Sequence, residues 1–390
     1  MRYYTWYSVR CFLSLVAQCL IVASCAPLSS VPWEAGLRDT SEDKNDLLHQ
    51  SRKWVTEYGR AEAADLLEEA LADQDESQGL MESRMLATNN EKSLVYPNSL
   101  HTIPMEDRKR VAIYFVLGLR QDRGRAAPII KRAVEHMQQR GFRAQFIDVV
   151  PRKTAQEHAL LVAESLKEDL PHVDKAVLIG FSRGSADLVH FWLGPSRIIP
   201  ESDLAKIKVW VNFTGVIRGS AVARWMAVGK EPTAWVFRWC LNMLNMTPRS
   251  SMIDLASIGY DRWAAPGNKL PGSVRQHLNV INFVSIPDGT NGWPSKDPYK
   301  SILAVNATKH GPVLGPCDGL VESAATVLPP NTEIKQWIVR VKGSHIILSG
   351  KYLNGNMVAS KYHQGRKARL ESGSQLMDDF LRAMPRSLLK

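Results

Sequence analysis

From residue 111 onward, short apolar runs rich in β-branched residues alternate with amphipathic stretches. The apolar runs cover residues 111–118, 142–150, 174–180, 207–215, 278–286 and 334–341. Stretches with helical spacing between the first runs cover residues 126–141, 154–170 and 184–194. Strands that are apolar throughout are buried on both faces, and their alternation with helices indicates a parallel sheet. The pattern therefore predicts a doubly wound, mostly parallel α/β domain with ligands at the carboxyl ends of its strands.

Two helical patterns precede this domain. The first places an apolar face on one helix, made of Leu47, Leu48, Trp54, Val55 and Tyr58. Gly59 interrupts this pattern, and a second one follows. Its apolar positions are Leu66, Leu67, Ala70 and Leu71. We expect a helical hairpin here, within a tether and helical N-terminal extension over residues 25–108 that precedes the main domain over residues 109–390.

The first residues have the layout of a secretory signal peptide. Arg2 and Arg10 give a basic start, and the apolar stretch that follows is too short for a stable membrane helix. It ends in Val-Ala-Ser-Cys, which resembles the lipobox of bacterial lipoproteins. That resemblance implies removal of residues 1–24 and a membrane anchor of acyl chains on Cys25, and Ala26 favours the outer membrane of the bacterial cell envelope. The alternative is an ordinary cleaved signal that contains a cysteine.

The composition is that of a chain with a sizeable core: 390 residues, 45% of them hydrophobic, and a formal net charge of +10. The lysines and arginines are scattered, and no basic cluster interleaved with aromatic residues indicates a nucleic-acid partner. Beyond Cys25, only Cys240 and Cys317 remain in the mature chain. An exported protein could pair these two, but they make no disulfide framework and lack metal-ligand spacing. We expect structural cysteines, no metal and no organic cofactor.

A serine between two glycines ends one of the apolar runs. Residues 174–180 lead into Gly-Phe-Ser-Arg-Gly, and a helical pattern starts directly afterwards. G-x-S-x-G between a strand and a helix is the layout of a nucleophile elbow, in which the serine is strained and its neighbours are nearly free of side chains. Gly180 and Gly184 meet this demand, and the positive helix end favours an oxyanion beside Ser182. The alternative is a glycine-rich turn with a capping serine.

A serine nucleophile also needs a general base and an acid that orients the base. With a nucleophile elbow, the acid is expected after a late strand and the histidine after the last one. His345 follows the final predicted strand in a glycine-containing loop, whereas His363 lies in a basic, polar stretch. Two acids compete, because Asp288 directly follows a strand and Asp318 lies further along, in Cys-Asp-Gly-Leu-Val-Glu-Ser-Ala. The predicted base is therefore His345, and these residues alone leave the acid open.

The motifs resemble those of the α/β-hydrolase superfamily, particularly its bacterial lipase and esterase branch, over residues 110–390. In that branch a D-G-[LV]-V segment followed closely by a serine carries the acid of the catalytic triad. The resemblance therefore places the acid at Asp318, with Asp288 as the alternative.

The resemblance also implies an oxyanion hole made of two backbone N–H groups. One belongs to Arg183, which follows the nucleophile. The other comes from the loop after the first strand, at Leu119 or Arg120. Family members often have His-Gly in this loop, where this chain has Leu-Gly. Only backbone groups are needed, so this departure does not forbid catalysis.

Residues 218–263 are rich in Trp, Met and Phe and follow the strand after which hydrolases of this class usually insert a cap or lid. The large apolar side chains are Trp225, Met226, Trp235, Phe237, Trp239, Met243 and Met246. They would make an apolar wall suited to an acyl chain. An equally good interpretation is a pair of helices that pack these side chains on the sheet, and the two roles are compatible.

Taken together, the resemblance implies a lipid-anchored serine hydrolase that cleaves a carboxylic ester, with a lipid-like ester as the expected substrate. A serine peptidase or amidase on the same scaffold is the nearest alternative, because the fold does not choose the acyl substrate. A non-catalytic binding module of the cell envelope is a third, which the intact serine, acid and histidine disfavour.

Overall fold

A computed structural model of the chain describes residues 46–117, 127–149, 153–243, 255, 263, 270–287, 298–309, 313–329, 332–343, 345, 351–352 and 366–390. The predictions for the signal peptide, Cys25, Leu119 and Asp288 lie outside these residues. Within them, every helix is too short or too polar to span a membrane.

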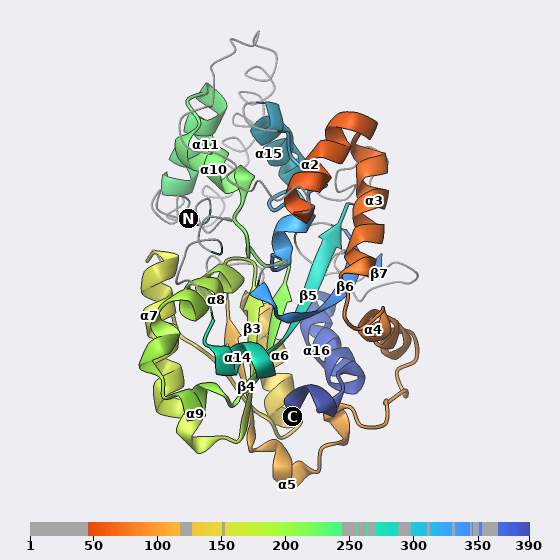
Figure 1. Cartoon of the computed structure of the whole chain (residues 1–390), viewed down its shortest axis with the longest axis vertical. Coiled ribbons are helices and arrows are strands. Elements are labelled where there is room, and N and C mark those ends of the chain that lie inside the picture. Colours follow the sequence, from red (N-terminus) through yellow and green to blue (C-terminus); the bar gives the residue numbers. More distant parts are fainter. Residues whose placement is uncertain are drawn as a thin grey trace, which may run out of the picture.

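The described strands form one sheet in the order β2-β1-β3-β4-β5-β6-β7 (Figure 1). Their bounds are β1 Val111–Val116, β2 Arg143–Phe146, β3 Lys175–Phe181, β4 Ile207–Phe213, β5 Asn279–Ile286, β6 Lys335–Lys342 and β7 Lys351–Tyr352. The first six strands run parallel, and the short β7 pairs antiparallel with β6. All six predicted strands are present, although β2, an edge strand bonded to β1, is shorter than its apolar run. The predicted doubly wound, mostly parallel architecture is confirmed.

Helices cover both faces of this sheet (Figure 1). One core is shared by the helices α4 Leu80–Asn90, α6 Ala127–Gln139 and α16 Arg366–Ala383. The other is shared by α2 Leu47–Tyr58, α3 Arg60–Asp73, α7 Ala155–Asp169 and α8 Arg183–Leu193. Short helices in the connections are α5 Met105–Arg108, α9 Glu201–Leu204 and α14 Gly272–His277. The helices predicted over residues 126–141, 154–170 and 184–194 correspond to α6, α7 and α8.

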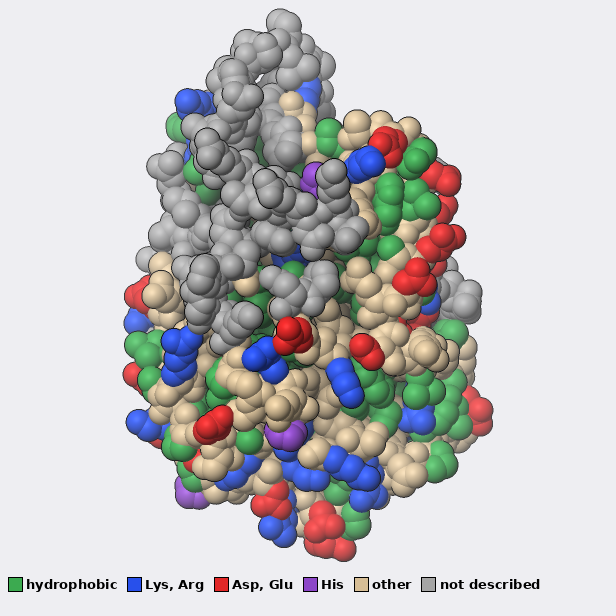
Figure 2. Space-filling view, in the orientation of Figure 1, with side chains coloured by type: hydrophobic (Ala, Val, Ile, Leu, Met, Phe, Trp, Pro, Cys, Tyr) green, Lys and Arg blue, Asp and Glu red, His purple; other side chains and the backbone are tan. Residues whose placement is uncertain are grey.

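The N-terminal hairpin is present, and it is part of the core. Gly59 separates α2 from α3 and has a φ of 85°, which glycine adopts readily. Leu47 and Leu67 are buried against the sheet, whereas Tyr58, predicted on the same apolar face, is 60% exposed because the helix ends there. Figure 2 shows acidic side chains along the outer face of α3, which leaves its apolar face for the interior. The boundary near residue 108 stays a prediction.

A ladder of buried amides crosses the middle of the sheet, within runs that are otherwise mainly apolar. Asn212 Nδ2 on β4 donates to Asn282 Oδ1 on β5, and Asn282 Nδ2 donates to Gln336 Oε1 on β6, both at 2.9 Å. The Gln336 amide also exchanges hydrogen bonds with the backbone of Leu328 at 2.8 and 3.0 Å. Buried polar groups require such partners, so the ladder ties three strands to the segment that follows Asp318.

Helices α10 Ala221–Val228, α11 Pro232–Met243 and α15 Pro298–Lys309 form a cap region beyond the carboxyl ends of the strands (Figure 1). Trp225 and Met226 pack in the core, as the packing interpretation predicts. Trp235 is 59% exposed, and Val228 and Val305 are also exposed, so the described part of the cap presents apolar side chains on its surface. The side chains of Phe237 and Trp239, and residues 244–269 except Leu255 and Trp263, lie outside the described part.

Candidate active site

Ser182 occupies a strained turn between β3 and α8. Its φ and ψ are 51° and −115°, a conformation that residues with side chains rarely adopt. A Cβ on Gly184 would lie 2.0 Å from the carbonyl oxygen of Val116, and a Cβ on Gly180 would lie 2.7 Å from Ser185 Oγ. Glycine is therefore required on both sides, and the turn has the geometry that the motif predicted.

The turn brings Ser182 together with the predicted base and acid. Ser182 Oγ lies 2.6 Å from His345 Nε2, and His345 Nδ1 lies 2.8 Å from Asp318 Oδ2. His345 is 7% exposed and Asp318 is fully buried. The three residues thus form a hydrogen-bonded chain at the carboxyl edge of the sheet, although they come from three distant segments.

The carboxylate of Asp318 is oriented by its own loop. Asp318 Oδ1 accepts hydrogen bonds from the backbone N–H groups of Leu320 and Val321 at 2.9 and 2.8 Å. The second oxygen is thereby directed at His345, whose backbone N–H donates to the carbonyl of Asp318 at 2.9 Å. Thr214 adds a further contact, because its Oγ1 donates to the carbonyl of His345 at 2.8 Å. The imidazole is therefore held by side-chain and backbone contacts together.

A row of phenylalanine rings lies across the strand ends next to the turn. Phe181, Phe213 and Phe283 are aligned on β3, β4 and β5, with ring centroids 4.7 and 4.3 Å apart. Phe115 on β1 extends the row at 6.4 Å from Phe181. The backbone N–H of Ser182 donates to the carbonyl of Phe213 at 3.1 Å. Stacked aromatic pairs contribute stabilisation beyond that of their buried area, so these rings stabilise the strand ends next to the turn.

Comparison with solved structures identifies the fold. The crystal structure of the metagenomic carboxyl esterase MGS0156 aligns with a TM-score of 0.51 and 15% identity, covering 82% of this chain and 93% of that one. The chain has the α/β-hydrolase fold. A Bacillus licheniformis lipase, BlEst2, aligns with a TM-score of 0.44 and 18% identity over 62% of this chain and 88% of that one. A monoacylglycerol lipase from Paleococcus ferrophilus aligns with a TM-score of 0.33 and 15% identity, covering 68% of this chain and 95% of that one.

Comparisons at the level of sequence give no relative. No protein-family model matches this chain, and no curated protein matches it. The roles of individual residues in this α/β-hydrolase fold therefore rest on the geometry of the site.

A buried charged cluster behind the turn was not predicted from the sequence. Arg183, named for its backbone N–H, has a buried side chain that donates to the carbonyl of Lys153 and lies 3.7 Å from Asp187. Asp187 is fully buried and its Oδ2 lies 3.0 Å from His158 Nδ1. Arg183 and Asp187 lie four residues apart on one helix, and this spacing indicates an ion pair. The contact between Asp187 and His158 has no such signal in the sequence, because His158 belongs to the separate helix α7.

Cys317, the residue before the acid, is a buried free thiol. Burial raises its pKa well above the ordinary value, and the neighbouring charge of Asp318 raises it further. A thiol that stays protonated is a poor nucleophile, so burial and the raised pKa favour a structural role for Cys317. The side chain of Cys240 lies outside the described part, and the described residues contain no cluster of acids, histidines and cysteines able to hold a metal.

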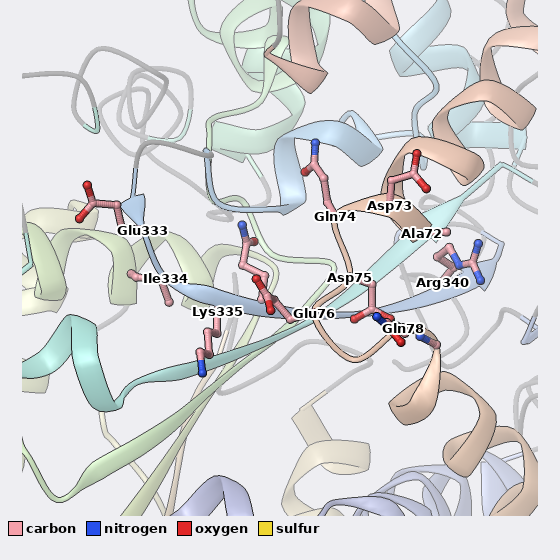
Figure 3. A pocket seen from close by; sticks show the side chains of 12 residues that line it. Ala72, Asp73, Gln74, Asp75, Glu76, Gln78, Glu333, Ile334, Lys335 and Arg340 are labelled. Atoms are coloured by element: carbon pink, nitrogen blue, oxygen red, sulfur yellow. Dashed lines mark hydrogen bonds between the residues drawn. The ribbon is translucent and has the colours of Figure 1, made fainter.

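A concavity lies apart from Ser182, His345 and Asp318, between the turn after α3 and strand β6 (Figure 3). Its volume is about 1140 Å³, and polar side chains including Asp75 and Arg340 line it. Asp75 accepts hydrogen bonds from the backbone N–H groups of Ser77, Gly79 and Ile338. Its carboxylate therefore stabilises the turn after α3 and links this turn to β6. The concavity does not include Ser182, His345 or Asp318.

Proposed function

We propose that this protein is a serine hydrolase that cleaves a carboxylic ester through an acyl-enzyme intermediate. The observation that carries the proposal is the hydrogen-bonded chain from Ser182 through His345 to Asp318. A nucleophile within hydrogen-bond reach of a base, and a base oriented by a third group, is the arrangement that activates a serine hydroxyl.

In the first half-reaction, Ser182 Oγ attacks the carbonyl carbon of the ester while His345 Nε2 takes the hydroxyl proton. Asp318 holds the imidazole in the required orientation and stabilises the imidazolium. The tetrahedral intermediate collapses, the C–O bond to the alcohol breaks, and His345 returns the proton to the leaving oxygen. Water then attacks the acyl-enzyme with His345 as the base, which releases the carboxylic acid and restores Ser182.

Two backbone N–H groups would stabilise the oxyanion. The N–H of Arg183 is the first of helix α8, and such a group has no partner within its helix. Leu119 is the proposed second donor, from the loop after β1. The contact between Gly184 and the carbonyl of Val116 supports this assignment, because it brings the end of β1 against the serine turn.

The substrate class is proposed from the cap and from the fold. The structure with the highest alignment score reported above is a carboxyl esterase, which supports an ester over an amide. The cap contributes Trp225 and Met226 to the interior and leaves Trp235 on the surface, a composition that suits an acyl chain. A lipid-like ester is therefore the proposed substrate, with a peptide or amide as the alternative.

A fluorophosphonate probe tests the proposal, because it reacts with activated serines whatever their natural substrate. We expect covalent labelling of the purified mature protein and loss of labelling in Ser182→Ala. Ser83→Ala, on an exposed position of α4, is the matched control and should label normally. A folded wild-type protein that does not label would contradict the proposal and favour a binding module. If the wild-type protein labels, a panel of p-nitrophenyl esters and anilides separates ester hydrolysis from amide hydrolysis.

We further propose that Cys25 carries the lipid anchor of an outer-membrane lipoprotein. The described chain begins at Asp46, which pairs with Arg218 beyond the carboxyl end of β4. The 21 Cα–Cα steps from residue 25 to residue 46 span at most about 75 Å when extended, so the tether would hold the candidate site near the membrane. Cys25→Ser should remain with the soluble fraction, and its continued fractionation with membranes would refute the anchor.

A further inference from the structure

The loop that carries Asp318 is irregular and nearly inaccessible to solvent. Between residues 313 and 329 its regular structure is the short 3-10 helix Ser323–Thr326. Of these residues only Val313 is exposed and only Leu320 is half-buried. Connecting segments normally lie on the surface, where water satisfies their backbone. A buried loop must instead be held by protein groups, and Ser51, Arg52 and Arg60 of the N-terminal extension are among those that contact this loop.

The strongest contact joins Arg52 of α2 to Glu322 in this loop. The Arg52 guanidinium donates to both carboxylate oxygens of Glu322, at 2.9 and 2.8 Å, across 270 residues of sequence. Glu322 is only 3% exposed. Its Oε1 also accepts the backbone N–H of Gly315 at 2.8 Å, and its backbone forms a β-bridge with Cys317. Glu322 thus closes the turn around Asp318, and Arg52 compensates its buried charge.

Other contacts place the extension against the same loop. Arg60, the first residue of α3, donates to the carbonyl of Leu314 at 3.0 Å. A Cβ on Gly315 would lie 2.5 Å from Ser51 Oγ, so the loop backbone packs directly on α2. At the start of α2, Asp46 pairs with both terminal nitrogens of Arg218 at 2.6 Å. The backbone N–H of Arg218 in turn donates to Ala325 within the loop, at 3.0 Å.

We infer that helix α2 positions the acid of the proposed triad, and that Arg52 is the positioning residue that acts through Glu322. The inference rests on the proposed function and assigns a role to the N-terminal extension. Without Arg52, Glu322 would be a buried carboxylate lacking its bidentate partner, a state that costs far more than the loss of a surface ion pair. The turn would rearrange to hydrate it. Asp318 would move with the turn, since it lies between Gly315 and Glu322.

Such a movement would impair the chemical step rather than binding. Misplacement of a catalytic group by about 1 Å can lower a rate by about a hundredfold. Arg52 contacts the loop through Glu322. The side-chain hydrogen bonds of Ser182, His345 and Asp318 are made with one another and with the backbone of Leu320 and Val321. Loss of Arg52 should therefore leave the affinity of the site for a ligand unchanged while the reactivity of Ser182 falls.

The concentration dependence of fluorophosphonate labelling separates these two quantities in the full mature chain. It yields the maximal rate constant of labelling and the half-saturating probe concentration. For Arg52→Ala we expect a maximal rate about ten- to a hundredfold lower and an unchanged half-saturating concentration. Arg52→Lys keeps the charge but loses the bidentate fork, so its maximal rate should be intermediate. Arg52→Lys also serves as the test if Arg52→Ala does not fold.

Arg140→Ala is the matched control, because Arg140 makes a partly exposed ion pair with Asp378 at 2.7 Å on the opposite face of the sheet. It should label at the wild-type rate. Folded Arg52 variants with a lower melting temperature but a maximal rate within twofold of wild type would show a purely structural role and overturn the inference. A wild-type protein that does not label would instead overturn the proposed function, and this inference with it.

Discussion

Ser182 Oγ and His345 Nε2 lie 2.6 Å apart, although 163 residues separate them along the chain. The contact requires two independent features of the fold. The strained turn at Ser182 presents the hydroxyl above the end of β3, and the loop after β6 returns the imidazole to the same edge. Disturbing either feature, or the acid that orients the imidazole, should lower the reactivity of Ser182 or the free energy of unfolding.

Asp318→Asn should reduce the rate of fluorophosphonate labelling by about 10³–10⁴-fold. The amide oxygen can still accept from Leu320 and Val321, so the loop should keep its conformation. The amide nitrogen would then face His345 Nδ1 and favour the wrong tautomer for a general base. Labelling rates, with circular dichroism as the check on folding, measure the effect. A folded variant that reacts within tenfold of wild type would rule out Asp318 as the acid and return attention to Asp288.

Gly184→Ala should destabilise the protein by at least about 2 kcal/mol. The added Cβ would lie 2.0 Å from the carbonyl oxygen of Val116, so the helix or β1 must move. Gly272→Ala is the matched control, because a Cβ there meets nothing within 4 Å and the variant should be neutral or slightly more stable. Urea denaturation of both variants gives the free energies of unfolding. Equal values for the two would refute the close contact at the serine turn.

Asn282→Leu should lower the free energy of unfolding by about 2–3 kcal/mol, because Asn212 and Gln336 both lose a buried partner. Asn212→Leu alone should also destabilise, and the double variant should cost less than the sum of the two single changes. Urea denaturation of all four proteins tests this cycle. Strict additivity would mean that the amide ladder contributes no coupling between the strands.

Cys317 should resist iodoacetamide in the native protein and react in the denatured one. Its thiol is fully buried, and its pKa is raised well above the ordinary value by burial and by Asp318. Thiolate is the reactive form, so raising the pH to about 9 should produce little modification while the protein stays folded. Mass spectrometry of the peptide that contains Cys317, after native and denaturing treatment, gives the readout. Rapid native modification would show that the acid loop opens to solvent.

Local patterns predicted the strands, the N-terminal hairpin and the turn at Ser182. Each depends on residues close together in sequence: apolar runs define buried strands, Gly59 interrupts a helix, and Gly180 and Gly184 leave room for a strained serine. The least accurate details lie at the ends and edges of elements, at Tyr58 and in β2, where burial depends on neighbouring segments.

Only the tertiary structure decided which distant side chains meet. The sequence left two acids open, and the structure brings Asp318 to His345, while Asp288 lies outside the described residues. No periodicity could reveal that Arg52 and Glu322 pair across 270 residues. The reason is physical. A strand or turn is determined by the sterics and hydrophobicity of adjacent residues, whereas a buried ion pair depends on the packed positions of separate elements.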